Sequence, residues 1–171
     1  LKTSDNTMTE VEGRLVAAHA KETTDFAGAS KAVLAQLSKD GFDTSGVTLL
    51  DSSGLAKGNK VPARLLTQIM TKAAGGEGGS AGRTLIADLP VAALDGTLGN
   101  RLHDTSAAGT VRAKTGSLEQ TASLAGVVTT ADGRQLAFAV LANNIPAGTS
   151  ATVAAAIDNH FVAPLASCGC S

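Results

Sequence analysis

Large aromatic residues are almost absent from this sequence. Its 171 residues include four Phe and neither Tyr nor Trp, so a folded core must be built mainly from Val, Leu, Ile and Ala. Charge is nearly balanced, with a formal net charge of -1, which argues against a nucleic-acid partner. No apolar run reaches the about 18 residues that a membrane span needs. These absences favour a globular domain with one hydrophobic core.

Cysteine and histidine are also scarce. Cys168 and Cys170 lie so close together that a relaxed disulfide between them is not expected, and zinc sites need two such pairs with wider spacing. Two alternatives stay open for them: unpaired thiols, or a bond to a segment outside this sequence if the protein is exported. The three histidines, His19, His103 and His160, lie on unrelated segments. Neither a metal site nor a histidine-based triad is therefore predicted.

Two stretches bear on the organisation of the chain. Leu1-Lys2-Thr3 lacks the charged and then apolar pattern of a signal peptide, which is typical of an internal point in a longer precursor. Residues 75–80, Gly-Gly-Glu-Gly-Gly-Ser, form the one low-complexity segment. Their composition is typical of a flexible natural or engineered linker.

The remaining sequence predicts helices followed by strands. Apolar positions recur at helical spacing after Asn6, whose side chain suits a loop or a cap, and Asp132-Gly133 is a strong hairpin signal. Three strands alone do not form a well-covered sheet. The predicted helices cover residues 7–21, 25–41, 61–70 and 151–165. The predicted strands cover residues 110–115, 122–128 and 135–143, and a short extended segment covers 48–50.

Two short motifs carry the chemistry. Lys114-Thr115-Gly116, followed by Ser117, lies on a predicted strand, and Ser4-Asp5-Asn6 lies just before the first predicted helix. Each motif alone has an ordinary structural explanation: a lysine that blunts an edge strand, or a cluster of residues that cap a helix. Together they are two of the three motifs shared by penicillin-binding proteins and class A β-lactamases. The third, Ser-x-x-Lys, supplies the nucleophile, and no serine of this sequence is followed by lysine at that spacing.

Other segments match one branch of that superfamily in the right order. The chain resembles the penicillin-binding protein 4 type D-alanyl-D-alanine carboxypeptidases and endopeptidases, the peptidase S13 family. Ser52 and Ala56 depart from the family's Asp-Gly-Ser-Gly-Leu-Ser segment. The matching segments are residues 4–10, 51–55 with Asn59, 89–92, 95–98, 111–118 and 124–126.

The resemblance implies an α+β, β-lactamase/transpeptidase-like fold, with an antiparallel sheet flanked by helices and completed by an N-terminal segment not in this chain. Residues 1–171 would be the C-terminal part of one penicillin-binding domain, helical over about 1–105, with the strands and closing helix over about 110–166.

The resemblance also implies roles for individual residues. Ser4 relays a proton to the leaving amine, and Asn6 holds the substrate amide and the lysine of the missing motif. Lys114 supplies positive charge, while Thr115 hydrogen-bonds the terminal carboxylate of the substrate. Gly116 leaves room for the substrate backbone, and Ser117 offers its backbone N–H to the oxyanion hole.

The implied activity is serine-type cleavage of D-Ala-D-Ala in peptidoglycan stem peptides through an acyl-enzyme, outside the cytoplasm, with inhibition by β-lactams and without a metal or organic cofactor. The implied partner is an N-terminal polypeptide of the same precursor that carries Ser-x-x-Lys. Two alternatives stay open: a non-catalytic binding relative, and a β-lactamase, for which Glu77 and Glu119 have the side-chain type of a deacylating base.

Overall fold

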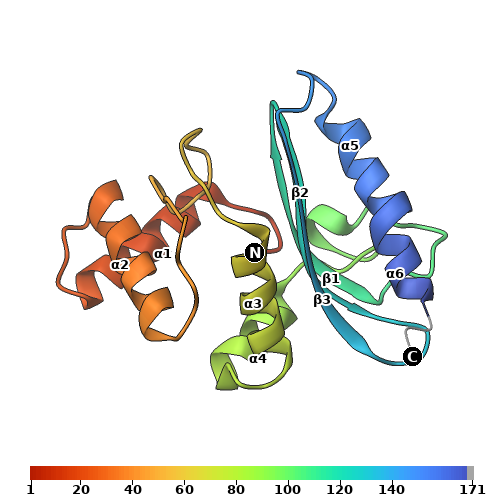
Figure 1. Ribbon diagram of the computed structural model, residues 1–171, viewed down its shortest axis with the longest axis horizontal. Helices are drawn as coiled ribbons and strands as arrows, with labels where there is room; N and C mark the ends of the chain where they lie inside the picture. The colour runs from red at the N-terminus through yellow and green to blue at the C-terminus, as the bar shows by residue number, and fades with distance from the viewer. Residues whose placement is uncertain (169–171) are drawn as a thin grey trace. The chain divides into compact units, whose positions relative to one another are not determined.

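The computed structural model describes residues 1–168 (Figure 1). Contacts divide the chain into two units: a helical unit, Ser4–Leu65, and a sheet unit, made of Leu1–Thr3 and the chain from Leu66 onward. Each unit is described by itself. The helices are α1 (Asn6–His19), α2 (Phe26–Lys39), α3 (Ala63–Ala74), α4 (Gly79–Asp88), α5 (Ser150–Ile157) and α6 (Ala163–Ser167), with a 3-10 turn η1 (Gly96–Leu98) and a π-helical turn η2 (Asp158–Val162). The strands are β1 (Val111–Leu118), β2 (Thr121–Thr129) and β3 (Gln135–Asn143).

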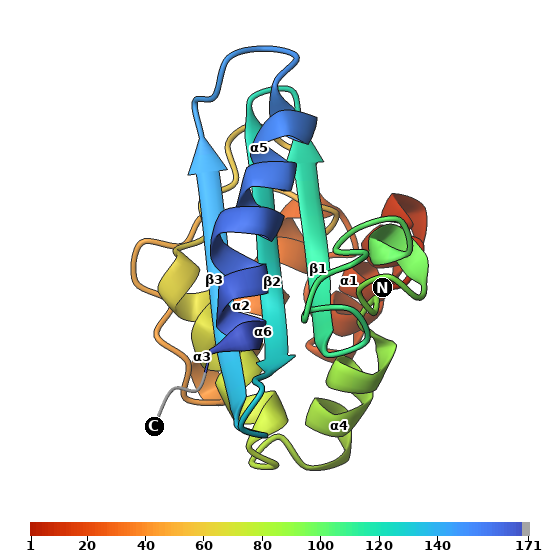
Figure 2. The same ribbon diagram turned by 90° about the vertical axis from the view of Figure 1, so that its right-hand side faces the viewer.

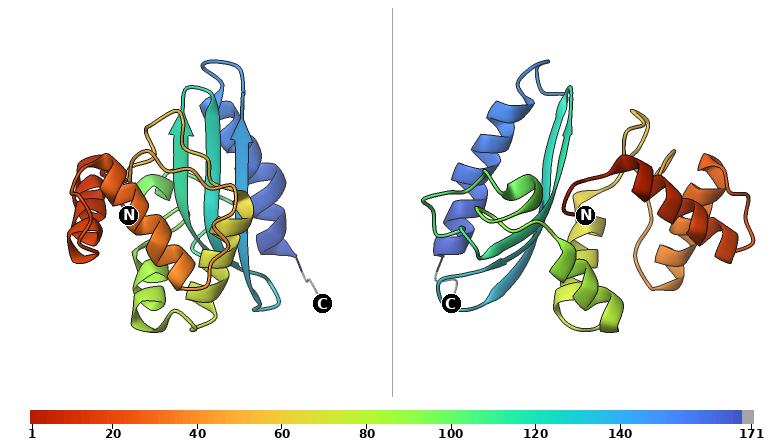
Figure 3. Two further views of the ribbon diagram at one scale, coloured as in Figure 1. Left: turned by 60° about the vertical axis from the view of Figure 1, so that its left-hand side comes forward. Right: turned by 180° about the vertical axis from the view of Figure 1, so that it is seen from behind.

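In the helical unit, α1 and α2 lie side by side (Figure 3). Their contact is built from small side chains, with Ala17, Ala29 and Ala32 buried together. The apolar positions that predict α1, including Met8 and Leu15, are more than half exposed. The helix was predicted correctly, but its close packing uses the small face rather than the apolar stripe.

The sheet of the sheet unit is antiparallel, in the order β1-β2-β3. The hairpin predicted at Asp132-Gly133 is confirmed: Gly133 has φ 82°, and the backbone N–H of Thr130 donates to the carbonyl of Arg134 at 2.8 Å. The strand predicted to end at Thr115 continues to Leu118, because residues 115–118 keep their pairing with β2. A two-residue turn then joins β1 to β2.

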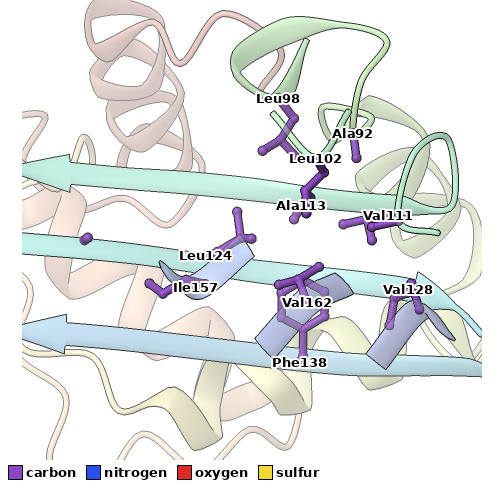
Figure 4. Close-up of a cluster of buried hydrophobic side chains, with 13 residues drawn as sticks. Ala92, Leu98, Leu102, Val111, Ala113, Leu124, Val128, Phe138, Ile157 and Val162 are labelled. Atoms are coloured by element: carbon purple, nitrogen blue, oxygen red, sulfur yellow. The ribbon is translucent and has the colours of Figure 1, made fainter. Parts of the chain in front are cut away.

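Helices cover one face of this sheet, as Figure 2 shows for α5 and α6. The main core lies between them and the strands, where Val111, Leu124, Phe138, Ile157 and Val162 are buried (Figure 4). Side chains alternate across the sheet. The opposite face therefore carries the even-numbered residues of β1 and the odd-numbered residues of β2.

Part of that opposite face packs against α3 and α4. Met70, Leu89 and Val127 form a second buried cluster there. The paired strands and the helices on both faces give the sheet unit the layered α+β arrangement expected from the sequence.

The glycine-rich stretch 75–80 is not a linker in this structure, because α4 begins inside it at Gly79. A Cβ on Gly82 would lie 3.0 Å from the Cα of Ala73, and a Cβ on Gly78 would lie 2.9 Å from the Cα of Gly82. The glycines therefore allow α3 and α4 to approach closely. Sequence composition alone suggested flexibility, and the helix after it was missed.

The closing helix, predicted as one element over 151–165, is interrupted by η2. Asp158 opens η2 and is buried, where its carboxylate accepts hydrogen bonds from the Arg101 guanidinium at 2.7 and 2.8 Å. Cys168 takes part in a disulfide bond, and Cys170 lies outside the described residues. Within residues 1–168, no helix combines the length and apolar character needed to cross a membrane.

Candidate active site

The outer edge of strand β1 is only partly covered by another segment of the chain. The backbone of Ala113 donates to Pro90, and the backbone of Val111 accepts from Ala92, each at 3.0 Å. Backbone groups of alternate residues point to the same side of a strand. The N–H and C=O groups of Thr115 and Ser117 therefore point to this outer edge, beyond the segment that Pro90 and Ala92 cover.

The Lys114 side chain begins on the face of the sheet away from α5 and reaches the same edge. Its Nζ donates to the backbone carbonyl of Thr115 at 2.7 Å, and the residue is half-buried. Burial lowers the pKa of the Lys114 ammonium from its ordinary value of 10.5, since removal from water disfavours the charged form. The outer edge of β1 thus carries the Lys114 ammonium, the outward carbonyl of Thr115 and the backbone N–H of Ser117.

The Thr115 side chain lies on the opposite face from Lys114. Its hydroxyl donates to the Thr97 hydroxyl at 2.9 Å. Thr97 belongs to η1, which Leu98 anchors by complete burial in the main core. The position of the Thr115 hydroxyl is therefore set by η1, a contact that no sequence motif indicated.

Gly116 pairs with Ser123 of β2. A Cβ at Gly116 would lie 2.3 Å from the Ser123 hydroxyl oxygen, and that hydroxyl donates weakly to the Gly116 carbonyl at 3.4 Å. The absence of a side chain is thus already required inside the sheet. Room for a substrate backbone at Gly116 stays a prediction.

Ser4-Asp5-Asn6 opens the helical unit. Asp5 is the N-cap of α1, and its carboxylate accepts from the backbone N–H of Met8 at 2.9 Å. The cap is thus Asp5 rather than Asn6, which is the first residue of α1 and is exposed. Ser4 has φ 55°, a left-handed conformation that is uncommon outside glycine and clusters at functional sites. This geometry assigns Asp5 a structural role as the helix cap, and roles for Ser4 and Asn6 in the reaction stay predictions.

The helical unit also contains a loop held by carboxylates. The Glu10 carboxylate accepts from the backbone N–H groups of Ser52 and Ser53 at 3.0 and 2.8 Å. Asp51 is buried and accepts from Asn59 at 2.6 Å and from Ala56 at 2.7 Å. Burial acts to raise the pKa of Asp51, but these hydrogen bonds outweigh it and hold the pKa below its ordinary value. Asp51 is therefore ionised at neutral pH and accepts hydrogen bonds from separate positions of the loop.

The predicted site residues therefore fall into two groups. The sheet unit brings Lys114, Thr115 and Ser117 to one strand edge, whereas Ser4 and Asn6 lie in the helical unit. Among residues 1–168 no group of three or more histidines, cysteines and carboxylates could hold a metal ion.

Comparison with known proteins assigns the chain to a family. The D-Ala-D-Ala carboxypeptidase 3 (S13) family matches residues 1–164. The chain is 46% identical to carboxypeptidase DacB of Mycolicibacterium smegmatis, covering 98% of this chain and 36% of the relative. It is 42% identical to carboxypeptidase Rv3627c of Mycobacterium tuberculosis, covering 100% of this chain and 37% of the relative.

A solved structure agrees with these relatives. Penicillin-binding protein 4 (dacB) of Haemophilus influenzae, complexed with a β-lactam, superposes with a TM-score of 0.80 at 32% identity, covering 86% of this chain and 34% of that one. The predicted fold class, α+β and β-lactamase/transpeptidase-like, is confirmed. The chain belongs to the D-Ala-D-Ala carboxypeptidase 3 (S13) family, as the ordered motifs predicted. It spans about a third of the length of these relatives.

Proposed function

We propose that residues 1–171 form the C-terminal part of a penicillin-binding domain and act as a serine-type D-Ala-D-Ala carboxypeptidase and endopeptidase. The nucleophile comes from a separate N-terminal polypeptide of the same precursor that carries Ser-x-x-Lys. We call this chain together with that polypeptide the assembled enzyme. The observation that carries the proposal is the outer edge of β1, with the Lys114 ammonium, the Thr115 hydroxyl and the outward Ser117 N–H.

In the assembled enzyme, an extended stem peptide pairs with this edge as an added strand. Its terminal carboxylate accepts a hydrogen bond from Thr115 and is attracted by the charge of Lys114. Asn6 holds the substrate amide. These contacts place the carbonyl of the penultimate D-Ala beside the nucleophilic serine.

The chemistry then proceeds in two steps. The serine oxygen bonds to the carbonyl carbon, the lysine of Ser-x-x-Lys takes the hydroxyl proton, and the Ser117 N–H stabilises the oxyanion. Ser4 delivers a proton to the leaving nitrogen as the C–N bond breaks, which releases D-alanine and leaves an acyl-enzyme. Water then hydrolyses the ester and restores the serine.

A β-lactam resembles the D-Ala-D-Ala terminus and would acylate the same serine. The structure of the Haemophilus influenzae relative is described as a complex with such a compound, which supports this part of the proposal. A peptidoglycan substrate requires action outside the cytoplasm, in the periplasm or cell wall.

Release of D-alanine from a synthetic stem peptide tests the proposal. We expect the assembled enzyme to release D-alanine and this chain alone to release none, because the chain has no Ser-x-x-Lys serine. Ser4→Ala should lower kcat by about 10²-fold, the usual contribution of a positioned proton donor. Ser45→Ala, a serine of the helical unit outside both motifs, serves as the matched control.

Two results would contradict the proposal. An inactive assembled enzyme that still binds the peptide would indicate a non-catalytic relative. Rapid hydrolysis of penicillin with no release of D-alanine would indicate a β-lactamase, and Glu119, in the turn between β1 and β2, would then be the first candidate base to replace.

A further inference from the structure

Lys2 is held tightly within the sheet unit, two residues before the Ser-Asp-Asn motif. Its Nζ donates to the Asp95 carboxylate at 2.6 Å and to the backbone carbonyl of Leu89 at 2.7 Å. The side chains of Lys2 and Asp95 are 36% and 40% exposed, so solvent screens the ion pair and its contribution to overall stability is small. The ion pair matters because it links the start of the chain to the segment beside strand β1.

Asp95 connects Lys2 to strand β1. Its second carboxylate oxygen accepts from the backbone N–H of Val91 at 2.8 Å, and Val91 forms a β-bridge with Arg112 of β1. The hydrogen bond from Lys2, followed by that from Val91, lowers the pKa of the Asp95 carboxyl. Asp95 is therefore ionised at neutral pH and accepts from both sides.

The main chain of Lys2 is fixed as well. Its carbonyl accepts from the backbone N–H of Thr97 at 3.1 Å. The neighbouring Gly96 has φ 56°, and a Cβ there would lie 2.6 Å from the Lys2 carbonyl oxygen. Only glycine permits this approach without displacing one of the two segments.

Thr97 closes the network on the substrate-binding strand, because its hydroxyl accepts from the Thr115 hydroxyl at 2.9 Å. Leu98, the last residue of the 3-10 turn that carries Thr97, accepts from the backbone N–H of Arg101 at 3.0 Å, and the Arg101 side chain makes two hydrogen bonds to the buried Asp158. One continuous set of contacts thus runs from Lys2 through the Asp95 loop to Thr115.

We propose that Lys2, Asp95 and Thr97 are positioning residues for the reaction: they hold the turn that carries Thr97 and so orient the Thr115 hydroxyl toward the substrate carboxylate. This inference rests on the proposed function.

In the Thr97–Thr115 pair, substrate binding requires both hydroxyl protons to change direction. A carboxylate can only accept hydrogen bonds, so substrate binding requires the Thr115 proton to turn away from Thr97. The Thr97 hydroxyl then donates to the Thr115 oxygen and keeps it in place. A carboxylate therefore gains a donor whose oxygen atom is already held in place, whereas a substrate ending in an uncharged amide gains less.

The test compares Lys2 and Thr97 variants of the assembled enzyme by the rate of acylation with a fluorescent penicillin and by kcat and KM for the stem peptide. Lys2→Met should lower the acylation rate about 10-fold, since a displaced Thr115 hydroxyl no longer orients the carboxylate of the penicillin. Lys2→Arg should restore most of the rate. Lys31→Met removes a lysine that pairs with Glu22 at 2.9 Å in the helical unit and should leave the rate unchanged.

Thr97→Val supplies the second measurement. It should raise KM for the peptide with a free carboxylate about 10-fold and change KM for the amide-terminated peptide much less, whereas Thr97→Ser should behave like the wild type. The positioning role would be overturned if the wild type is acylated and the Lys2→Met and Thr97→Val variants show the same rates and KM values as the wild type. Absence of wild-type acylation and D-alanine release would instead overturn the proposed function. Equal loss in Lys2→Met and Lys2→Arg, accompanied by a lower melting temperature, would assign the network a purely structural role.

Discussion

Replacing Lys114 with methionine is expected to lower the acylation rate of the assembled enzyme by about 10²- to 10³-fold, the usual cost of removing one electrostatic contact to the reacting groups. Lys114 is half-buried, and its ammonium lies 2.7 Å from the carbonyl of Thr115, at the strand edge proposed for the substrate. Methionine keeps the length and apolar stem but removes the charge. Lys39→Met, at an exposed position in the last turn of α2, should not change the rate.

The pH dependence of kcat/KM provides a second test of the role of the Lys114 charge. Burial lowers the pKa of Lys114 below 10.5, so kcat/KM should fall as pH rises through that lowered pKa, where the positive charge is lost. Lys114→Arg retains its charge throughout this range and should lack the alkaline fall, even if its shape reduces the maximal rate. Between the lowered pKa and 10.5 the unfolded chain binds more protons than the folded one, so the contribution of Lys114 to stability should rise with pH. An identical alkaline limb in wild type and Lys114→Arg would contradict this role.

Replacing Gly126 with valine should destabilise the sheet unit by at least about 3 kcal/mol, because the new side chain meets backbone atoms that cannot move aside. A Cβ at Gly126 would lie 2.1 Å from the carbonyl oxygen of Arg112 and 2.5 Å from the Cα of Ala113. These atoms belong to β1, the strand that carries Lys114. Chemical denaturation followed by circular dichroism measures the loss.

The matched control is Gly58→Ala. There a Cβ would lie 2.4 Å from the Leu50 Cδ1, the end of a side chain that is 49% exposed and can rotate away. A change of less than about 1 kcal/mol is expected. Equal stability of Gly126→Val and wild type would show that β1 and β2 do not approach as closely as described.

The elements that local patterns specify were predictable. Alternating apolar residues and the Asp132-Gly133 turn indicated β2 and β3, and apolar spacing indicated α1 and α2. The α4 helix was missed because glycine composition favours flexibility, whereas these glycines serve close packing between α3 and α4. The π-helical turn η2 was missed because it accompanies a long-range pair, Arg101 with Asp158, that no local pattern encodes.

In the candidate site, too, local sequence predicted some residues, whereas contacts between distant residues were not predictable. Short motifs identified Ser4, Asn6 and Lys114, because these residue types occur at recognisable positions within ordered segments. Residues 95–98 also belong to a matching segment, but the contacts of Thr97 with Thr115 and of Asp95 with Lys2 could not be predicted, since the partners lie 18 and 93 residues apart in sequence. Short motifs predict candidate reacting groups, whereas their contacts with distant residues become visible only in the fold.

The most direct test of the account is denaturing gel analysis of the assembled enzyme after reaction with a fluorescent penicillin, with an intact mass for every band. The label and its added mass should appear on the N-terminal polypeptide that carries Ser-x-x-Lys, and replacing Lys114 of this chain with methionine should slow this labelling about 10²- to 10³-fold. Label on this chain, or labelling of the N-terminal polypeptide that does not depend on Lys114, would contradict a site completed by the two polypeptides.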